Sequence, residues 1–483
     1  MAASSGESMA DRILISPVTR IEGHAKISIY LDDAGQVDSA QFHVVEFRGF
    51  EKICEGRPFH EMPALMARIC GICPVSHVLA SAKACDALLG VEVPPVATLL
   101  RRLMNYGQIL QSHALSFFHL SSPDLLMGFD SDPAKRNLFG LLEVEPDFAR
   151  RGIRLRKFGQ RIIEILGGKR IHPSWATPGG VLEPLAAAGR GEILTGVPEA
   201  LESVRIGLDR MKSLLDQFPD EIEHLGTFPS LFLGMVSETG TFEHYDGRIR
   251  ICDGEGNVVA DGLDPERYFT YIGEAAEESS YMKFPFYKPL GYPGGMYRVG
   301  PLARCNIVTS AGTPLANREL REFKQRGTEG VVCQTFHYHL ARLVEMLHVV
   351  ERIEEIASDP HVLDTRVRAQ AGQNVNEGVG ASEAPRGTLF HHYEVDDDGL
   401  MKRANLIIAT GQNNLAMNKA VEQAAKRFVN PSKLSEGMLN RVEAAIRCYD
   451  PCLSCSTHAL GRMPMEIAVR RQNGEVLDRL TRE

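Results

Sequence analysis

The chain has 483 residues, of which 44% are hydrophobic and 24% charged, and its formal net charge is −9. This length and composition are typical of a soluble globular protein with one large domain or two ordinary ones. The charge argues against a general nucleic-acid binder, because no basic cluster is present to neutralise phosphates. No apolar run approaches the roughly 18–20 residues of a membrane-spanning helix. The opening MAASSGESMADRI lacks the apolar stretch of a signal peptide. We therefore expect a cytoplasmic protein.

In chain order, the predicted elements begin with strands and continue mainly with helices. β-rich segments predict strands at 13–16, 24–31 and 37–47. A helical pattern over 61–90 is interrupted near Cys70, and Pro74 can open the second helix because a first-turn position needs no N–H. Further segments predict helices at 95–120, 147–167, 197–217, 330–358, 415–428 and 435–447, and a hairpin from 248–252 to 258–260. We expect one α+β domain, mainly α, with a central bundle of long helices and small antiparallel β elements.

The ten cysteines are too few for a disulfide scaffold in a chain of this length and indicate a reducing compartment. Four of them form two C-x-x-C pairs, Cys70 with Cys73 and Cys452 with Cys455. The alternatives are structural zinc, a redox-active dithiol, an iron–sulfur cluster and a sulfur-rich nickel site. Zinc ribbons close short loops, whereas these pairs lie nearly 380 residues apart. The nickel site alone uses both pairs in full.

The segments around the two pairs resemble the signature motifs of nickel–iron hydrogenase large subunits. They read RICGICPVSH and DPCLSCSTH and lie at opposite ends of the chain, as in that family. The resemblance implies that Cys70, Cys73, Cys452 and Cys455 bind nickel. It also implies that the second cysteine of each pair bridges to an iron that carries carbon monoxide and cyanide. A related complex I subunit shares the fold but lacks these cysteines, so the chain looks like a hydrogenase.

Further motifs match residues around the implied metal centre. In T-R-I-E-G-H, Glu22 is similar to a glutamate that takes a proton from a cysteine, and H2 splitting needs such a base. In A-P-R-G, Arg386 is similar to an arginine over the open metal position, which Asp124 and Asp450 would anchor. His77 is similar to a histidine that hydrogen-bonds a bridging thiolate. Taken alone, each also fits a solvated carboxylate, a surface turn, a helix cap or a core histidine.

The resemblance also implies a buried divalent cation, usually magnesium. Its protein ligands would be Glu51, His458 and a backbone carbonyl, that of Leu406, in the apolar run 406–408.

Residues 459–483 follow the histidine at which mature chains of the family end. The resemblance implies that 1–458 form the mature domain and that an endopeptidase cuts between His458 and Ala459 after nickel-insertion chaperones have acted. A permanent extension is the alternative. Alternating residues at 465–469 and 476–477 predict a hairpin, with its turn at Gln472-Asn473-Gly474.

We expect this extension to keep Cys452 and Cys455 out of their closed geometry until nickel arrives.

The reaction implied by the resemblance is reversible oxidation of H2 to protons and electrons. No further cluster motif is present, so a small subunit with iron–sulfur clusters must carry the electrons away. Ser454 stands where periplasmic enzymes usually have alanine, and the chain looks like the cytoplasmic NAD-reducing hydrogenases. NAD and flavin would bind diaphorase subunits, because no G-x-G-x-x-G follows a strand here. The alternatives are an NADP-, deazaflavin- or heterodisulfide-linked enzyme, or a non-catalytic H2-sensing or complex I-like subunit.

Overall fold

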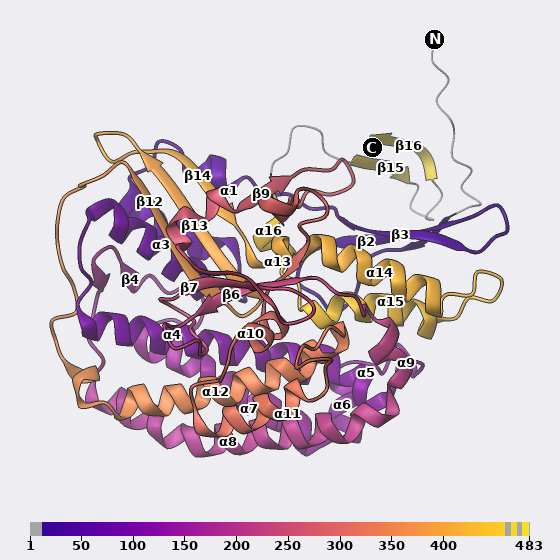
Figure 1. Ribbon diagram of the computed structural model, residues 1–483, viewed down its shortest axis with the longest axis horizontal. Coiled ribbons are helices and arrows are strands. Elements are labelled where there is room, and N and C mark those ends of the chain that lie inside the picture. Colours follow the sequence, from indigo (N-terminus) through magenta and orange to yellow (C-terminus); the bar gives the residue numbers. More distant parts are fainter. Residues whose placement is uncertain (1–11, 459–464, 471–475, 483) are drawn as a thin grey trace, which may run out of the picture.

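Four long helices form the base of the molecule. They are α4 (Pro95–Ala114), α7 (Pro146–Gly167), α8 (Ala187–Leu214) and α12 (Tyr338–Ser358). In this computed structural model, which describes residues 12–458 and the strands at 465–470 and 476–482, α4 packs against α7 and α12, and α8 packs against the same two helices. Figure 1 shows them side by side in the lower part of the view. The predicted α+β fold class with a central helix bundle is confirmed.

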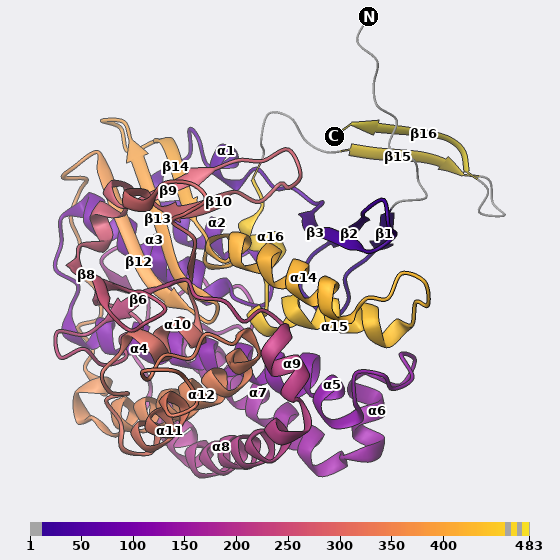
Figure 2. The same ribbon diagram turned by 45° about the vertical axis from the view of Figure 1, so that its right-hand side comes forward.

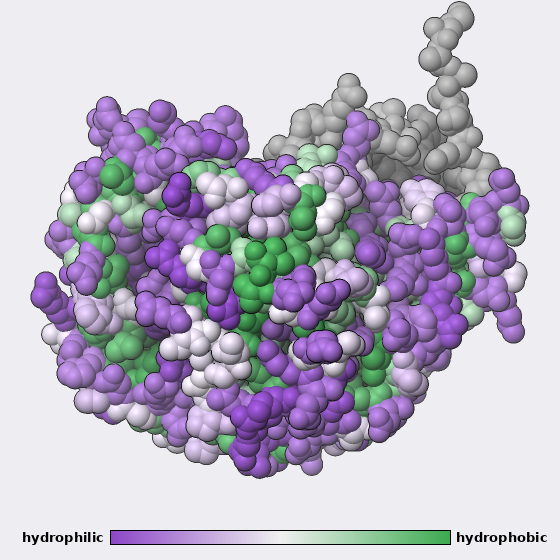
Figure 3. Space-filling view, in the orientation of Figure 1, coloured by the Kyte–Doolittle hydropathy of each residue, from purple (hydrophilic) through white to green (hydrophobic). Residues whose placement is uncertain are grey.

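The bundle helices are amphipathic and pack closely. A side chain added at Gly159 of α7 would place its Cβ 2.6 Å from the carbonyl oxygen of Gly107 in α4, so the missing side chain lets the two backbones approach. The outer side of the bundle is hydrophilic: Figure 3 shows polar residues over the lower part of the face, where Figure 1 places α8 and α11 (Pro314–Lys324). Apolar residues facing inward therefore explain the helical spacing in the sequence.

The N-terminal strands form an antiparallel sheet that lies against the C-terminal helices. They are β1 (Arg12–Ile15), β2 (Ala25–Leu31) and β3 (Val37–Val44). Helix α14 (Asn414–Phe428) packs on β3 and on α15 (Glu436–Tyr449), as Figure 2 shows. The two ends of the described domain are thus brought together.

A second sheet, which the sequence did not predict, covers α3 (Pro74–Leu89). It consists of β12 (Glu377–Ala384), β13 (Gly387–Val395) and β14 (Met401–Ile407), all antiparallel. A Cβ at Gly380 would lie 2.0 Å from the carbonyl oxygen of Ala80 in α3, so this glycine allows the helix to lie directly on the strand. This contact places the helix that follows Cys73 beside the A-P-R-G turn.

The remaining elements are short. The other helices are α1 (Phe50–Ile53), α2 (Met62–Met66), α5 (Ser122–Met127), α6 (Leu138–Val144), α9 (Pro219–His224), α10 (Pro301–Ile307), α13 (Ala409–Gln412) and α16 (Leu453–Ser456). The other strands are β4 (Ala176–Thr177), β5 (Gly180–Val181), β6 (Leu231–Val236), β7 (Arg248–Cys252), β8 (Val258–Leu263), β9 (Ile272–Ala275), β10 (Phe284–Tyr287), β11 (Tyr297–Arg298), β15 (Met465–Arg470) and β16 (Val476–Arg482).

Several predicted bounds change where tertiary packing overrides the local pattern. The helix predicted over 95–120 ends at Ala114 and continues as a π-helical turn, Leu115–Ser121, before α5. Helix α8 begins ten residues earlier than predicted and runs through Pro198. The helix predicted from residue 330 begins at Tyr338. The strand pair β11–β6 is parallel, so the β elements are not all antiparallel as predicted.

Within the described part of the chain, no helix is both long and apolar enough to cross a membrane. The strands predicted after residue 458 are present, since β15 and β16 pair antiparallel. Their predicted turn, Gln472-Asn473-Gly474, lies outside the described residues.

Candidate metal centre

The two C-x-x-C pairs meet in the interior. The sulfur atoms of Cys70 and Cys452 are 3.3 Å apart, as are those of Cys73 and Cys455, and the sulfurs of Cys452 and Cys455 are 2.9 Å apart. All four sulfurs lie within 4.8 Å of one another, and each side chain is at most 5% exposed. Four buried, unoxidised thiols at this spacing form a donor set for a soft metal.

Local structure at each pair directs the sulfurs to the same point. Cys73 is the N-cap residue of α3, and Pro74 occupies the first helical position, as predicted. At the other pair, α15 ends at Asp450, whose φ of 54° turns the chain back towards the sulfurs. The backbone N–H of Cys452 then donates to Thr410 Oγ1 at 3.0 Å. Both pairs therefore lie at helix ends, where the backbone changes direction.

The thiols share a negative charge unequally. Hydrogen bonds from Cys452, Cys455 and Cys70 hold the pKa of Cys73 well below its usual range. Burial raises the pKa of Cys452 and that of Cys455 well above the usual range. One thiolate stabilised by three neighbouring thiols is the state expected before a metal displaces the remaining protons.

Glu22 reaches the sulfur site from the N-terminal segment. Its Oε2 accepts a hydrogen bond from Cys452 Sγ at 3.2 Å and another from the backbone N–H of Ser454 at 3.0 Å. Its Oε1 accepts from the Ser454 hydroxyl at 2.5 Å, and its carbonyl accepts from the N–H of Leu453. The carboxylate is thus in direct contact with one thiol, which is the geometry that proton transfer requires.

Arg386 lies on another side of the sulfurs, at the turn between β12 and β13. Its guanidinium donates to the backbone carbonyl of Asp450 and, at 3.1 Å, to the Asp450 carboxylate. Burial opposes the charge, but Asp450 and the neighbouring thiolates raise the pKa of Arg386 well above its usual range. Burial also raises the pKa of Asp450, although Arg386 counteracts it. A permanent cation therefore faces the sulfurs, with Asp450 as its partner.

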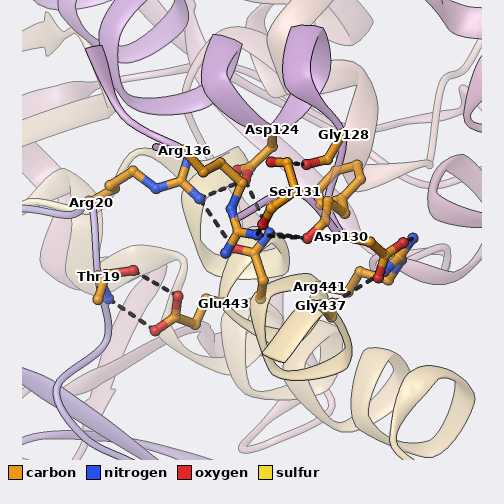
Figure 4. A network of polar contacts seen from close by, with 12 residues as sticks. Thr19, Arg20, Asp124, Gly128, Asp130, Ser131, Arg136, Gly437, Arg441 and Glu443 are labelled. Carbon is orange, nitrogen blue, oxygen red and sulfur yellow. Dashed lines mark hydrogen bonds and ion pairs between the residues drawn. The ribbon is translucent and has the colours of Figure 1, made fainter. Parts of the chain in front are cut away.

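Asp124 has different partners from those predicted. Among the described residues, no hydrogen bond or ion pair joins it to Arg386. Its carboxylate binds Arg20 at 2.5 Å, Arg447, and Arg136 at 3.3 Å, and it accepts from Asn440. Figure 4 shows part of this network, in which the Arg20 segment meets the helices that carry Asp124 and Arg136. The prediction that Asp124 anchors Arg386 is corrected, because three nearer guanidinium groups compensate its charge.

The same network fixes the segment that carries Glu22. Thr19 donates from its N–H and its hydroxyl to the Glu443 carboxylate, at 3.1 and 2.7 Å, and Arg20 adopts a positive φ of 56°. Although burial opposes ionisation, Arg447 and Arg20 lower the pKa of Asp124. Asp124 therefore acts on the site indirectly, through the segment that holds Glu22.

His77 lies one helical turn after Cys73 and faces the sulfurs. The pKa of Cys73 is lowered mainly by the other thiols, and a hydrogen bond with His77 adds to this effect. The ring also meets His391 Nε2 at 3.2 Å, and His391 continues to the Tyr393 hydroxyl at 2.7 Å. Sequence reasoning missed His391, although its position two residues before Tyr393 on one strand face was a usable signal.

Arg304 was also missed, and it holds the turn that carries Arg386. Its guanidinium donates to the carbonyl oxygens of Ala384 and Pro385 at 3.0 and 3.1 Å. The Glu345 and Glu383 carboxylates bind it on either side, at 2.5 and 2.6 Å. A lone arginine in a short helical segment gives no sequence signal for this role.

Glu51, His458 and Leu406 lie together, as predicted. Glu51 Oε2 is 3.0 Å from His458 Nδ1, and the backbone N–H of Leu406 donates to Glu51 Oε1 at 2.9 Å. Although burial favours the neutral acid, hydrogen bonds with His458 lower the pKa of Glu51. Lys283 Nζ lies 4.0 Å from Glu51 and brings a positive charge to the same place. Leu406 contacts Glu51 through its N–H, whereas a carbonyl ligand was predicted.

The predicted effect of residues 459–483 is wrong in one respect. The sulfurs of Cys452 and Cys455 already converge with those of Cys70 and Cys73 in the chain that carries the extension. Convergence of the thiols is a property of the packed domain, since α3, β12 and α15 position them.

A cavity of about 260 Å³ adjoins the sulfurs. Cys73, Cys452 and Cys455 line it on one side and Arg386 on another, and the rest of its wall includes Ala384, Leu389, Ile408 and Ala409. A mostly apolar chamber beside soft ligands has room for metal atoms and small uncharged molecules.

Comparisons with known proteins agree with this geometry. Residues 48–134 and 234–458 match the family profile described as nickel-dependent hydrogenase, and residues 12–47 match one described as HoxL-like. The chain is 42% identical to the NAD-reducing hydrogenase HoxS subunit beta of Cupriavidus necator, over 98% of this chain and all of the relative. It is also 42% identical to the large vhu polypeptide of the F420-non-reducing hydrogenase of Methanococcus voltae, over 86% of this chain and 98% of the relative.

Solved structures show the same similarity. An NAD+-reducing [NiFe]-hydrogenase in its H2-reduced state superposes with a TM-score of 0.90 and 46% identity, covering 92% of this chain and 99% of that one. A Ni-Fe-Se hydrogenase from D. vulgaris Hildenborough shares the fold, with a TM-score of 0.76 and 24% identity over 92% of this chain and 99% of that one. The chain therefore belongs to the nickel-dependent hydrogenase family, as a large subunit.

Proposed function

We propose that the chain is the H2-activating subunit of an NAD-reducing nickel–iron hydrogenase complex. The observation that carries the proposal is the convergence of four buried sulfurs from opposite ends of the chain beside the Glu22 carboxylate. A structural zinc site would use the same thiols but would need neither this carboxylate nor a cavity.

The thiols fit the proposed metals by their donor chemistry. Cys70, Cys73, Cys452 and Cys455 would hold nickel, and Cys73 and Cys455, whose sulfurs line the cavity, would also bridge to iron. The apolar part of the cavity wall suits carbon monoxide and cyanide on that iron, and Arg386 can donate to them from the opposite side.

When bound, a nickel–iron pair supplies the Lewis acidity and open position at which H2 is split and its electrons are taken up. The chain's own residues handle the proton. Cys452 receives it on sulfur, and Glu22 Oε2, 3.2 Å away, takes it from the thiol. Arg386 favours the thiolate forms through its fixed positive charge, and Asp450 keeps the guanidinium in place. His77 stabilises negative charge on the Cys73 sulfur.

A magnesium site at Glu51 and His458 is part of the proposal, with Leu406 beside it. A carboxylate, an imidazole and backbone oxygen atoms can hold magnesium together with water. Two contacts compete with the ion, because Leu406 presents its N–H and Lys283 already lies near the carboxylate. Magnesium content of the purified complex tests this part.

The electron acceptor lies outside this chain in the proposal. Similarity to the NAD-reducing hydrogenases supports a small subunit with iron–sulfur clusters and diaphorase subunits that carry flavin and NAD. A complex that reduces NAD would work in the cytoplasm. The relative from Methanococcus voltae favours a second candidate, an enzyme of the same chemistry that passes electrons to another acceptor.

We also propose that the mature domain is 1–458. Nickel-insertion chaperones would act first, and an endopeptidase would then cut between His458 and Ala459. His458 is 7% exposed and contacts Glu51, so a new carboxylate there would lie inside the proposed magnesium site.

Purification of the chain with its co-expressed partner subunits tests the function. We expect nickel and iron in equal amounts, infrared bands of diatomic ligands, a chain mass that ends at residue 458, and H2-dependent reduction of NAD. Zinc alone, without these bands and without H2 oxidation, would contradict the proposal. H2 oxidation with viologen but not with NAD would instead favour the second candidate.

A further inference from the structure

A chain of hydrogen bonds continues from Glu22 to the surface. In the described part of the chain, the Glu22 carboxylate bonds only to Cys452 and Ser454. The Ser454 hydroxyl, 2.5 Å from Glu22 Oε1, also lies 2.9 Å from Glu46 Oε1. Glu46 Oε2 then lies 3.0 Å from His24 Nδ1.

Exposure increases along this chain. The Ser454 residue is 4% exposed, whereas the side chains of Glu46 and His24 are 23% and 75% exposed. The polar groups thus lead in three steps from the buried sulfur site to water.

The fold places these groups together from segments that are far apart in sequence. Ala25 pairs with Val44 across β2 and β3, and this register puts His24 beside the residues that follow β3. Gly23 supplies the room: a Cβ there would lie 2.6 Å from Glu46 Oε1 and 2.7 Å from Leu453 Cβ. Its φ of +89° is a second reason for glycine at this position.

The hydrogen count at Ser454 favours transfer over a static contact. A hydroxyl has one hydrogen, so it can donate to only one of the two carboxylates. The second contact is a hydrogen bond only when the other carboxyl holds a proton and donates to the Ser454 oxygen. The arrangement is therefore complete with one shared proton.

We infer that Ser454, Glu46 and His24 form a proton exit from the metal centre to solvent, an inference that rests on the proposed function. A proton on Glu22 Oε1 passes to Ser454 Oγ while the serine hydrogen passes to Glu46 Oε1. Glu46 then protonates His24 Nδ1, and the ring releases its Nε2 proton to water. Each group regains its starting proton count after it reorients, so one proton crosses and no electron moves.

The test uses the complete complex with Glu46→Gln, which keeps the shape of the side chain but cannot carry the proton. We expect H2 oxidation to fall ~100-fold, the lower end of the range for loss of a general acid–base group. Nickel and iron content and the infrared bands of the diatomic ligands should stay unchanged. Interconversion of para- and ortho-H2, which needs cleavage but no proton release, should also persist.

A spectroscopic measurement gives a readout besides turnover. Infrared difference spectra between H2-reduced and oxidised enzyme should lose the carbonyl band of one protonated carboxyl in Glu46→Gln. Glu55→Gln is the matched control, because Glu55 is also an exposed carboxylate in an ion pair, with Lys52, but lies off the path. It should show the wild-type rate and spectrum.

His24→Ala is the second variant, and its exposure makes a folding defect unimportant. We expect a ~10-fold lower rate that imidazole in the buffer restores, whereas imidazole should not restore Glu46→Gln. Rates of both variants within twofold of wild type, with full metal content, would overturn the proton exit. A wild-type complex that does not oxidise H2 would overturn the proposed function, and the exit with it.

Discussion

The sulfur site and the cluster around Arg304 are both fully buried, yet their polar groups are satisfied in different ways. In the Arg304 cluster, Glu345 and Glu383 bind the guanidinium at 2.5 and 2.6 Å, and all three side chains have no exposed area. In the sulfur site, the thiols have mainly one another as partners. A buried set whose charges are internally balanced maintains structure, whereas a set of donors without partners is suited to bind something else.

The largest effect should come from removing one sulfur. Cys73→Ser changes one atom, but a serine oxygen is a poor ligand for nickel, so we expect nickel at background and H2 oxidation reduced by more than ~100-fold. Metal analysis and H2 uptake by the complex measure both. Cys305→Ser is the control, since Cys305 is buried in the apolar core and its pKa is raised by burial. Loss of nickel in the control as well would erase the distinction between the two regions.

The next effect concerns the balanced cluster. Arg304→Met leaves the Glu345 and Glu383 carboxylates buried without their cation, so we expect about 3–5 kcal/mol lower stability. The urea midpoint of unfolding measures this change. Arg403→Met removes an exposed ion pair with Glu394 and should cost less than about 1 kcal/mol. Equal midpoints for the two variants would show that the buried cluster does not maintain structure.

The pH dependence of stability sharpens the same point. Burial lowers the pKa of His113 from 6.5 to about 4, although a hydrogen bond to Glu345 opposes the shift. The unfolded chain therefore takes up a proton before the folded chain does, and stability falls as the pH drops from 6.5 towards 4. One such group accounts for about 3 kcal/mol across that window. His113→Gln keeps a donor for Glu345 and should flatten the unfolding midpoint against pH; an unchanged slope would contradict the prediction.

The smallest effect should come from the residue that joins the two regions. Arg386→Lys keeps the charge but loses the two-point contact with Asp450, so we expect about 10-fold slower H2 oxidation with unchanged nickel content. Steady-state kinetics and metal analysis of the complex check this. A rate equal to that of wild type would mean that charge alone is needed beside the sulfurs.

Much of the fold followed from local patterns. The apolar spacing in α7, α14 and α15 predicted these helices to within two residues, and Pro74 marked the start of α3. Local patterns missed the β12–β14 sheet, because its strands are buried on both faces and lack the alternation that marks a half-exposed strand.

The candidate site divides in the same way. The sequence by itself determined the ligand chemistry, since the spacing and flanking residues of Cys70, Cys73, Cys452 and Cys455 are local properties. Only the tertiary structure decided which charges pair. Asp124 binds Arg20, Arg136 and Arg447 rather than Arg386. The physical reason is that a buried carboxylate takes the nearest cations, and which cations are near depends on how distant segments pack.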